Sequence, residues 1–263
     1  MLPMTLVKLN KKNNVTTLTL NDPDQLNAMS VPMGKEFKKI IAKLKKDKST
    51  RVVVITGEGR AFSSGGDLQM LEKMTHQSPA KNKKDLKGFY SFFLGIRDLP
   101  QPVIAAVNGH AIGAGFCVAL ACDLRYVSED AKLGANFARI GLSPGMAGTY
   151  SLTRLLGPTL ASELMLTGKT FSAKDAKEYG LVNGVLPAKK LLKQVYEVAE
   201  QIAQNGPLAV TTIKKGIQLA LHKSFDQMLD IDSAGQARCF QTKDIKRGIK
   251  AIRAKEKPQF KGN

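Results

Sequence analysis

The chain has 263 residues, of which 43% are hydrophobic, 40 are Lys or Arg and 22 are Asp or Glu, so its formal net charge is +18. A chain of this length and apolar content can bury a full core, which excludes disorder and coiled coil as its main state. Three cysteines and three histidines offer neither a spaced ligand cluster nor an even disulfide framework. We therefore expect no metal site and a reduced, cytoplasmic setting.

Membrane and nucleic-acid partners are not favoured by the sequence. The segment Met1–Leu6 shows no basic region followed by an apolar stretch, so no signal peptide is predicted. The longest apolar stretch, residues 103–122, is interrupted by Asn108, His110 and three glycines, which excludes a lipid-facing helix. The lysine runs are typical of solvated faces, and few aromatic residues interleave with them as stacking platforms for bases.

The first half of the chain predicts alternating strands and helices. Residues 5–10 and 15–20 indicate a β-hairpin, and Ser30 is a candidate cap for a helix through about Lys46. The β-branched runs at 51–57 and 102–107 are typical of strands covered on both faces. Between them we expect a mobile, lysine-rich loop over 75–87 and a helix over 86–96. This alternation predicts an α/β layered fold.

The second half of the chain predicts helices. Ser172 and Asp175 have the spacing of a capping box, and Gly180 suits the end of that helix. Helical periodicity then covers residues 188–204, 208–222, 225–239 and 245–255.

Two segments fifty residues apart share one design. A strand at 52–56 leads into Gly59–Leu68 (GRAFSSGGDL), and a strand at 103–107 leads into Gly109–Phe116 (GHAIGAGF). Small residues at such turns let a ligand approach the backbone, and the first amides of a helix have no carbonyl partner within it. Two such turns on neighbouring strands can aim one N–H each at a single oxygen, the geometry that holds a developing oxyanion.

Other interpretations of these glycine clusters are weaker. Each cluster alone is explained by close packing of a helix on a sheet, but the matched duplication favours a site. Phosphate binding is less favoured because neither segment has the Walker pattern with its Lys-Ser/Thr, and no Gly-x-Gly-x-x-Gly opens a dinucleotide site.

Seven stretches together resemble the crotonase superfamily, the enoyl-CoA hydratase/isomerase family. They cover nearly the whole chain: 21–28, 52–57, 61–68, 102–109, 121–123, 141–145 and 166–182. The resemblance implies a ββα-superhelix core, placed here at residues 1–200, and a helical region at 201–263 that builds homotrimers or hexamers. It also implies an acyl-CoA thioester as substrate, with no tightly bound cofactor.

The resemblance also assigns site residues. The oxyanion donors would be the backbone amides of Gly66 and Ala114. The positions expected to contact the coenzyme A moiety are Asn27, Ala28, Ser64, Asp67, Leu68, Phe260 and Lys261, of which the last two would reach the nucleotide of a neighbouring copy. Asp67 and Asp123 fall in motifs shared by relatives of differing activity, which favours a structural role for both.

The chain departs from the family where the catalytic acids stand. Hydratases of this family use two glutamates, one to activate water and one to move the proton at the α-carbon. Gapless alignment from Asn108 to Pro144 places Cys117 and Phe137 at these positions. Phenylalanine cannot ionise and a thiol is a poor carboxylate substitute, while the acid of the Pro-Glu-Gly turn found in isomerases is also missing at Gly145. We therefore expect ordinary hydration to be poor.

Two other functions stay open at this stage. An oxyanion hole stabilises a thioester enolate however the enolate arises, so decarboxylation of a malonyl-type thioester is one alternative. A non-catalytic binder of acyl-CoA, or of nucleic acid through the basic surface, is the other. The candidate polar groups are Asn136, Ser143, His110, Tyr90, Lys87 and Cys117. For His110, Lys87 and Tyr90 a structural role is the simpler interpretation, and Cys117 is expected to be a small buried apolar residue.

Overall fold

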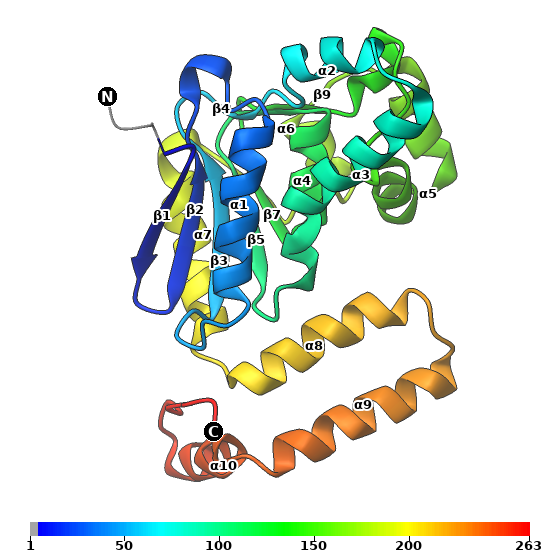
Figure 1. Cartoon of the computed structure of the whole chain (residues 1–263). Coiled ribbons are helices and arrows are strands. Elements are labelled where there is room, and N and C mark those ends of the chain that lie inside the picture. The colour runs from blue at the N-terminus through cyan, green and yellow to red at the C-terminus, as the bar shows by residue number, and fades with distance from the viewer. Residues whose placement is uncertain (1–4) are drawn as a thin grey trace.

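The computed structural model describes residues 5–263 (Figure 1). Met1–Met4, part of the segment in which no signal peptide is predicted, lie outside the described residues. Across the described range, none of the helices has the length and apolar character needed to cross a membrane.

The chain begins with an antiparallel hairpin and a capped helix. Strands β1 (Val7–Lys12) and β2 (Val15–Leu20) pair through the turn at 13–14, so the first strand both begins and ends two residues later than expected. A short 3-10 turn, η1 (Pro23–Gln25), precedes α1 (Val31–Leu44). The hydroxyl of Ser30 accepts a hydrogen bond from the amide of Met33, which confirms the predicted helix start.

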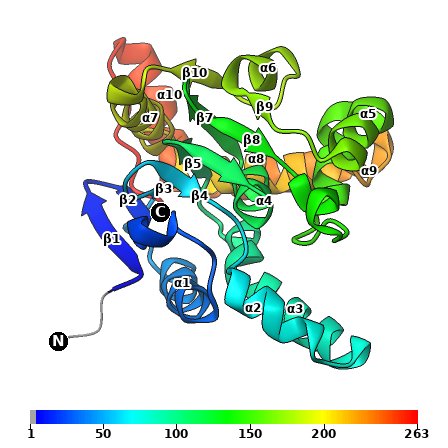
Figure 2. The same ribbon diagram turned by 90° about the horizontal axis from the view of Figure 1, so that it is seen from above.

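A six-stranded sheet forms the centre, in the order β1-β2-β3-β5-β7-β10. From β2 onward the neighbours are parallel: β3 (Val52–Gly57), β5 (Val103–Val107), β7 (Leu124–Ser128) and β10 (Gly184–Leu186). Val53 and Ile55 face one core cluster, whereas Val52 and Val54 face the other. The strand is therefore covered on both faces, as predicted, with α1 and α7 on opposite sides of the sheet (Figures 1 and 2).

A repeating unit builds a second sheet across the ends of the first. This sheet has the order β4 (Ala61–Ser63), β6 (His110–Ile112), β8 (Lys132–Gly134) and β9 (Phe171–Ser172). Three successive units each give one strand to each sheet and then a helix, namely α2 (Leu68–Thr75), α4 (Ala114–Ala121) or the 3-10 helix η3 (Asn136–Ile140). The structure thus confirms the α/β ββα superhelix and adds a third unit to the two found in the sequence.

The expectation of a mobile loop over 75–87 is wrong. Helix α2 reaches Thr75, and α3 runs from Pro79 to Leu94, followed by the 3-10 turn η2 (Gly95–Asp98). Ser78 caps α3 by accepting from the amide of Lys81 at 3.4 Å. Pro79 is the first residue of α3, a position that favours proline because its missing N–H would have no partner there.

The remaining helices lie in the second half of the chain, and those that begin after residue 172 follow the predicted ranges. They are α5 (Gly148–Thr167, kinked at Gly157), α6 (Ala173–Glu178), α7 (Ala188–Ala203), α8 (Pro207–Ala220), α9 (Phe225–Phe240) and α10 (Lys243–Ala254). The capping box of Ser172 and Asp175 forms as expected. Helix α7 packs on the sheet through residues up to Ala203. Figure 1 shows α8, α9 and α10 below the sheet.

Candidate active site

The two glycine-rich turns lie side by side because the strands before them are neighbours. β4 and β6 run parallel and pair Ala61 with His110. Gly65 has a φ of +106°, and a Cβ there would lie 2.8 Å from the oxygen of Ile112 and 3.5 Å from the nitrogen of Ala114. A residue with a side chain fits neither this conformation nor this approach. The glycine therefore lets the two turns meet.

The amides of Gly66 and Ala114 are both unpaired within residues 5–263. Ala114 is the first residue of α4, so its N–H has no carbonyl partner in the helix. Around Gly66, the bridge to Met29 uses the amide of Met29, which donates to Gly65 O at 2.7 Å, and the amide of Asp67, which donates to Met29 O at 3.3 Å. The amide of Gly66 is left over. Two free donors thus stand on adjoining turns.

A third loop, around Asn27, packs against the first turn. The amide of exposed Ser64 donates to Leu26 O at 2.9 Å, and half-buried Ala28 follows in the same loop. Asn27 is fully buried, and its side chain accepts from the Asp22 amide and donates to the carbonyl oxygens of Glu58 and Ala61. Asn27 therefore fixes the loop, and its side chain has no group left for a ligand.

Phe137 and Asn136 lie beside the second turn. Measured from a Cβ placed on Gly113, the Oδ1 of Asn136 is 3.5 Å away and the ring of Phe137 is 3.8 Å away. Gly113 has a φ of +53°, and its carbonyl accepts the first hydrogen bond of α4, from Cys117. At the second expected acid position, the turn that presents the Ala114 amide therefore faces an apolar ring.

Cys117 lies one turn along α4 from Ala114 and is 1% exposed. Its Sγ is 3.8 Å from the carbonyl oxygen of Gly145. Burial raises the pKa of the Cys117 thiol to about 12, so the thiol stays protonated at neutral pH. This confirms the expectation of a small buried residue, and the thiol cannot act as the missing carboxylate.

The carboxylates left in the motifs have structural partners. Asp67 accepts from the amide of Met70 at 2.8 Å and caps α2. Asp123 accepts from the amide of Val103 at 2.7 Å and pairs with Lys214, also at 2.7 Å. His110, another candidate, uses its Nδ1 to accept from the amide of Lys132. Nowhere in the range 5–263 do His, Cys, Asp and Glu side chains gather into a group that could hold a metal ion.

The residues expected to contact coenzyme A fall into two places. Leu68 opens α2 beside the first turn and is 76% exposed. Phe260 lies at the other end of the sheet, where its carbonyl accepts from Arg51, just before β3 begins. Lys261 follows it. A single chain therefore does not bring Phe260 and Lys261 to the turns that follow β3 and β5.

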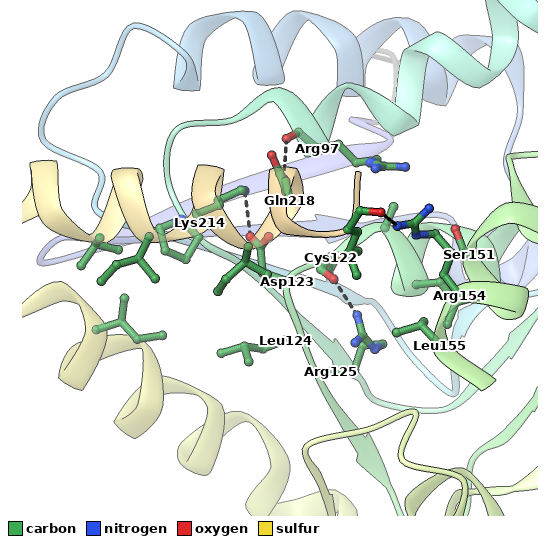
Figure 3. A pocket seen from close by; sticks show the side chains of 18 of the residues that line it. Arg97, Cys122, Asp123, Leu124, Arg125, Ser151, Arg154, Leu155, Lys214 and Gln218 are labelled. Carbon is green, nitrogen blue, oxygen red and sulfur yellow. Dashed lines mark hydrogen bonds and ion pairs between the residues drawn. The ribbon is translucent and has the colours of Figure 1, made fainter. Parts of the chain in front are cut away.

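A cavity of about 430 Å³ lies away from the turns, between α8 and the starts of β5 and β7 (Figure 3). Its walls include the Lys214–Asp123 pair and Arg125, whose guanidinium donates to the carbonyl oxygen of Cys122 at 2.6 Å. Arg154 reaches across it to the carbonyl of Leu221. None of the expected site residues lines it. This cavity lies where α8 packs against the core, and it is separate from the two turns.

One part of the site escapes sequence analysis. Met146 and Ala147 both have left-handed backbones, with φ of 53° and 54°. This turn brings the Gly145 carbonyl and Gly148 against the Cys117 thiol. Residues other than glycine seldom adopt this conformation, and nothing in their side chains predicts it.

Comparisons with known proteins found similar sequences and structures over nearly the whole chain. The family model described as enoyl-CoA hydratase/isomerase matches residues 10–263. The short-chain-enoyl-CoA hydratase of Clostridium acetobutylicum is 33% identical over 95% of each chain, and the crotonyl-CoA hydratase of Syntrophomonas wolfei is 32% identical over 96% of each. The crystal structure of an enoyl-CoA hydratase from Bacillus anthracis superimposes with a TM-score of 0.93, at 34% identity, over 98% of this chain and all of that one.

Proposed function

Because this chain belongs to the enoyl-CoA hydratase/isomerase family, within the crotonase superfamily, we propose that it stabilises a thioester enolate between the amides of Gly66 and Ala114. The observation that carries the proposal is the pair of unpaired amides on adjoining turns. Fixed donors aimed at an oxygen on which charge develops stabilise the transition state more than the ground state. The ligand is an acyl-CoA thioester, and the proposal needs no tightly bound cofactor.

The proposed chemistry differs from efficient hydration. Adding water to an enoyl thioester needs one group to activate the water and one to move the α-proton. Cys117 and Phe137 supply neither, because the thiol is buried and protonated and the phenyl ring has no proton to exchange. The carboxylates of Asp67 and Asp123 are held by their structural partners. This donor set supports enolate stabilisation without a carboxylate base.

Crotonyl-CoA tests this proposal in two measurements. Calorimetric titration is expected to show binding, and loss of the enoyl thioester absorbance is expected to be slow or undetectable. Hydration at a rate typical of hydratases would show that the acids have been placed incorrectly. Binding without turnover of any thioester would favour a non-catalytic acyl-CoA binder, and absence of binding would refute the proposal.

Decarboxylation of a malonyl-type thioester is a second candidate, supported by the ring of Phe137 beside the turn. An apolar wall disfavours a substrate carboxylate, and loss of carbon dioxide moves the negative charge from the carboxylate to the enolate oxygen. The bond between the α-carbon and the carboxylate breaks, its electron pair stays as the enolate, and the α-carbon then takes up a proton. Incubation with methylmalonyl-CoA and mass spectrometry of the thioester tests this candidate, and unchanged substrate counts against it.

We also propose that the chain assembles as a trimer or hexamer. Five apolar side chains on α8 and α9 are more than half exposed in the single chain: Ile213, Ile217, Phe225, Leu229 and Phe240. Such exposure is costly in water and favours burial against another copy. Assembly would also allow Phe260 and Lys261 to reach a neighbour's coenzyme A. Light scattering coupled to gel filtration measures the mass, and a monomer would refute this.

A further inference from the structure

The hydroxyl of Tyr90 is held in place but unpaired. Tyr90 lies on α3, half-buried, with its ring packed edge-on against Phe89 at a centroid distance of 6.3 Å. No atom of residues 5–263 accepts from or donates to this hydroxyl, and the oxygen is not among the sealed polar atoms of the interior. A polar group that the core positions and leaves reachable is available to a ligand.

This hydroxyl lies against Gly145, whose carbonyl in turn contacts α4. A Cβ on Gly145 would lie 2.5 Å from the Tyr90 oxygen, so the hydroxyl fills the space that any side chain at 145 would need. The Gly145 carbonyl in turn lies 3.8 Å from the Sγ of Cys117. Cys117 and Ala114 are three residues apart and share one face of α4. Tyr90 therefore lies against the Gly145 turn, which also contacts α4 at Cys117, one helical turn from the Ala114 amide.

Other candidate proton donors at these turns are occupied or unsuited. The Cys117 thiol is buried against Gly145, and Asp67 caps a helix. His110 is bonded to the amide of Lys132. An asparagine such as Asn136 has no proton that it can transfer at neutral pH. Tyr90, by contrast, combines a transferable proton with an unpaired, reachable position.

We propose that Tyr90 is the proton donor to the α-carbon of the thioester enolate, an inference that rests on the proposed function. In this step the phenolic O–H bond breaks and a C–H bond forms with the electron pair of the enolate. The thioester carbonyl is restored, and its oxygen, now neutral, is held less strongly by the two amides. The phenolate then regains its proton from water.

The protonation state of Tyr90 suits this role. Burial, together with the neighbouring Cys117, raises the pKa of Tyr90 above its ordinary value of 10.0. The phenol therefore keeps its proton at neutral pH. In the reverse direction the phenolate removes an α-proton, so that direction accelerates as the pH rises toward the pKa of Tyr90.

Exchange of the α-protons of butyryl-CoA in D2O, followed by mass spectrometry, tests the proposal without depending on the overall reaction. The wild type is expected to exchange, faster at pH 9 than at pH 7. Tyr90→Phe is expected to lower the rate by about 100-fold, the lower bound for a positioned acid or base. Its Kd for butyryl-CoA should stay within about twofold, because binding does not need the proton. The matched control is Tyr126→Phe, a half-buried tyrosine packed on the opposite face of the sheet.

Each outcome decides one claim. If Tyr90→Phe exchanges as fast as the wild type, Tyr90 is not the donor and the proposed function stands. If the wild type binds butyryl-CoA without exchanging its protons, the donor assignment is also overturned. If butyryl-CoA does not bind, the proposed function fails first. Should Tyr90→Phe not fold, incorporation of 3-fluorotyrosine serves instead: it lowers the phenol pKa and is expected to move the acceleration to lower pH, and an unmoved profile refutes the role.

Discussion

Removing one backbone amide without removing its residue isolates the central claim. Gly66→Pro deletes the N–H, whereas Gly66→Ala keeps it and adds only a methyl group. A Cβ at this position meets nothing closer than 3.9 Å, the Cε of Met70, so the alanine variant is expected to fold without strain. The deleted N–H makes no hydrogen bond within residues 5–263, so its loss leaves no acceptor unsatisfied in the fold.

The expected magnitude follows from the role of the donor. Removing one oxyanion donor lowers kcat by about 10²–10³, or about 2.7–4 kcal/mol of transition-state stabilisation. We therefore expect Gly66→Pro to exchange the α-protons of butyryl-CoA about 10²–10³ times more slowly than Gly66→Ala. The Kd should change far less, because the enolate oxygen carries more charge than the thioester oxygen.

A second pair of variants repeats the test on the other turn. Ala114 is the first residue of α4, where proline is tolerated, so Ala114→Pro removes the N–H and leaves the helix intact. Ala114→Gly is its matched control. Circular dichroism and thermal melting establish that all four variants are folded. If both proline variants exchange as fast as their controls, the backbone oxyanion hole does not exist and the enzymatic proposal has no basis.

Three further predictions concern the framework around the site. Gly65→Ala is expected to destabilise the fold by more than the roughly 1–2 kcal/mol of a left-handed alanine, because its Cβ would also meet a carbonyl oxygen at 2.8 Å, and urea denaturation measures this. Lys214→Met should lower the free energy of unfolding by about 3 kcal/mol, the low end for a broken buried ion pair, because the Asp123 side chain is 27% exposed. The control Lys215→Met, at an exposed lysine, should lower it little. Equal losses in the two variants would contradict a role for the pair. Burial raises the pKa of Cys117 from 9.0 to about 12, so its contribution to stability is present below pH 9 and is lost as the pH rises toward 12. Because the buried thiol stays protonated, its alkylation in the folded protein at pH 7, followed by peptide mass spectrometry, should be very slow.

Much of the fold is written locally in the sequence. Ser30 and Ser172 cap helices through residues three positions away, and the β-branched run at 52–56 becomes a strand because its side chains suit burial on both faces. The same local reasoning fails around Pro79, because proline disrupts the interior of a helix but is favoured at its first position, where Pro79 stands in α3. The repeated Gly-x-Ala pattern predicted two matching turns, and these form on neighbouring strands.

The meeting of distant segments was decided by the tertiary structure. The register of β4 on β6 brings Gly65 against Ala114, and the left-handed turn at 146–147 places Gly145 between Cys117 and Tyr90. The sequence singled out the two free amides and the missing acids, since both depend on residue type at a motif position. It could not show that the Tyr90 hydroxyl lies against Gly145, because these residues are 55 positions apart and meet only through strand register and backbone angles, which no local pattern encodes.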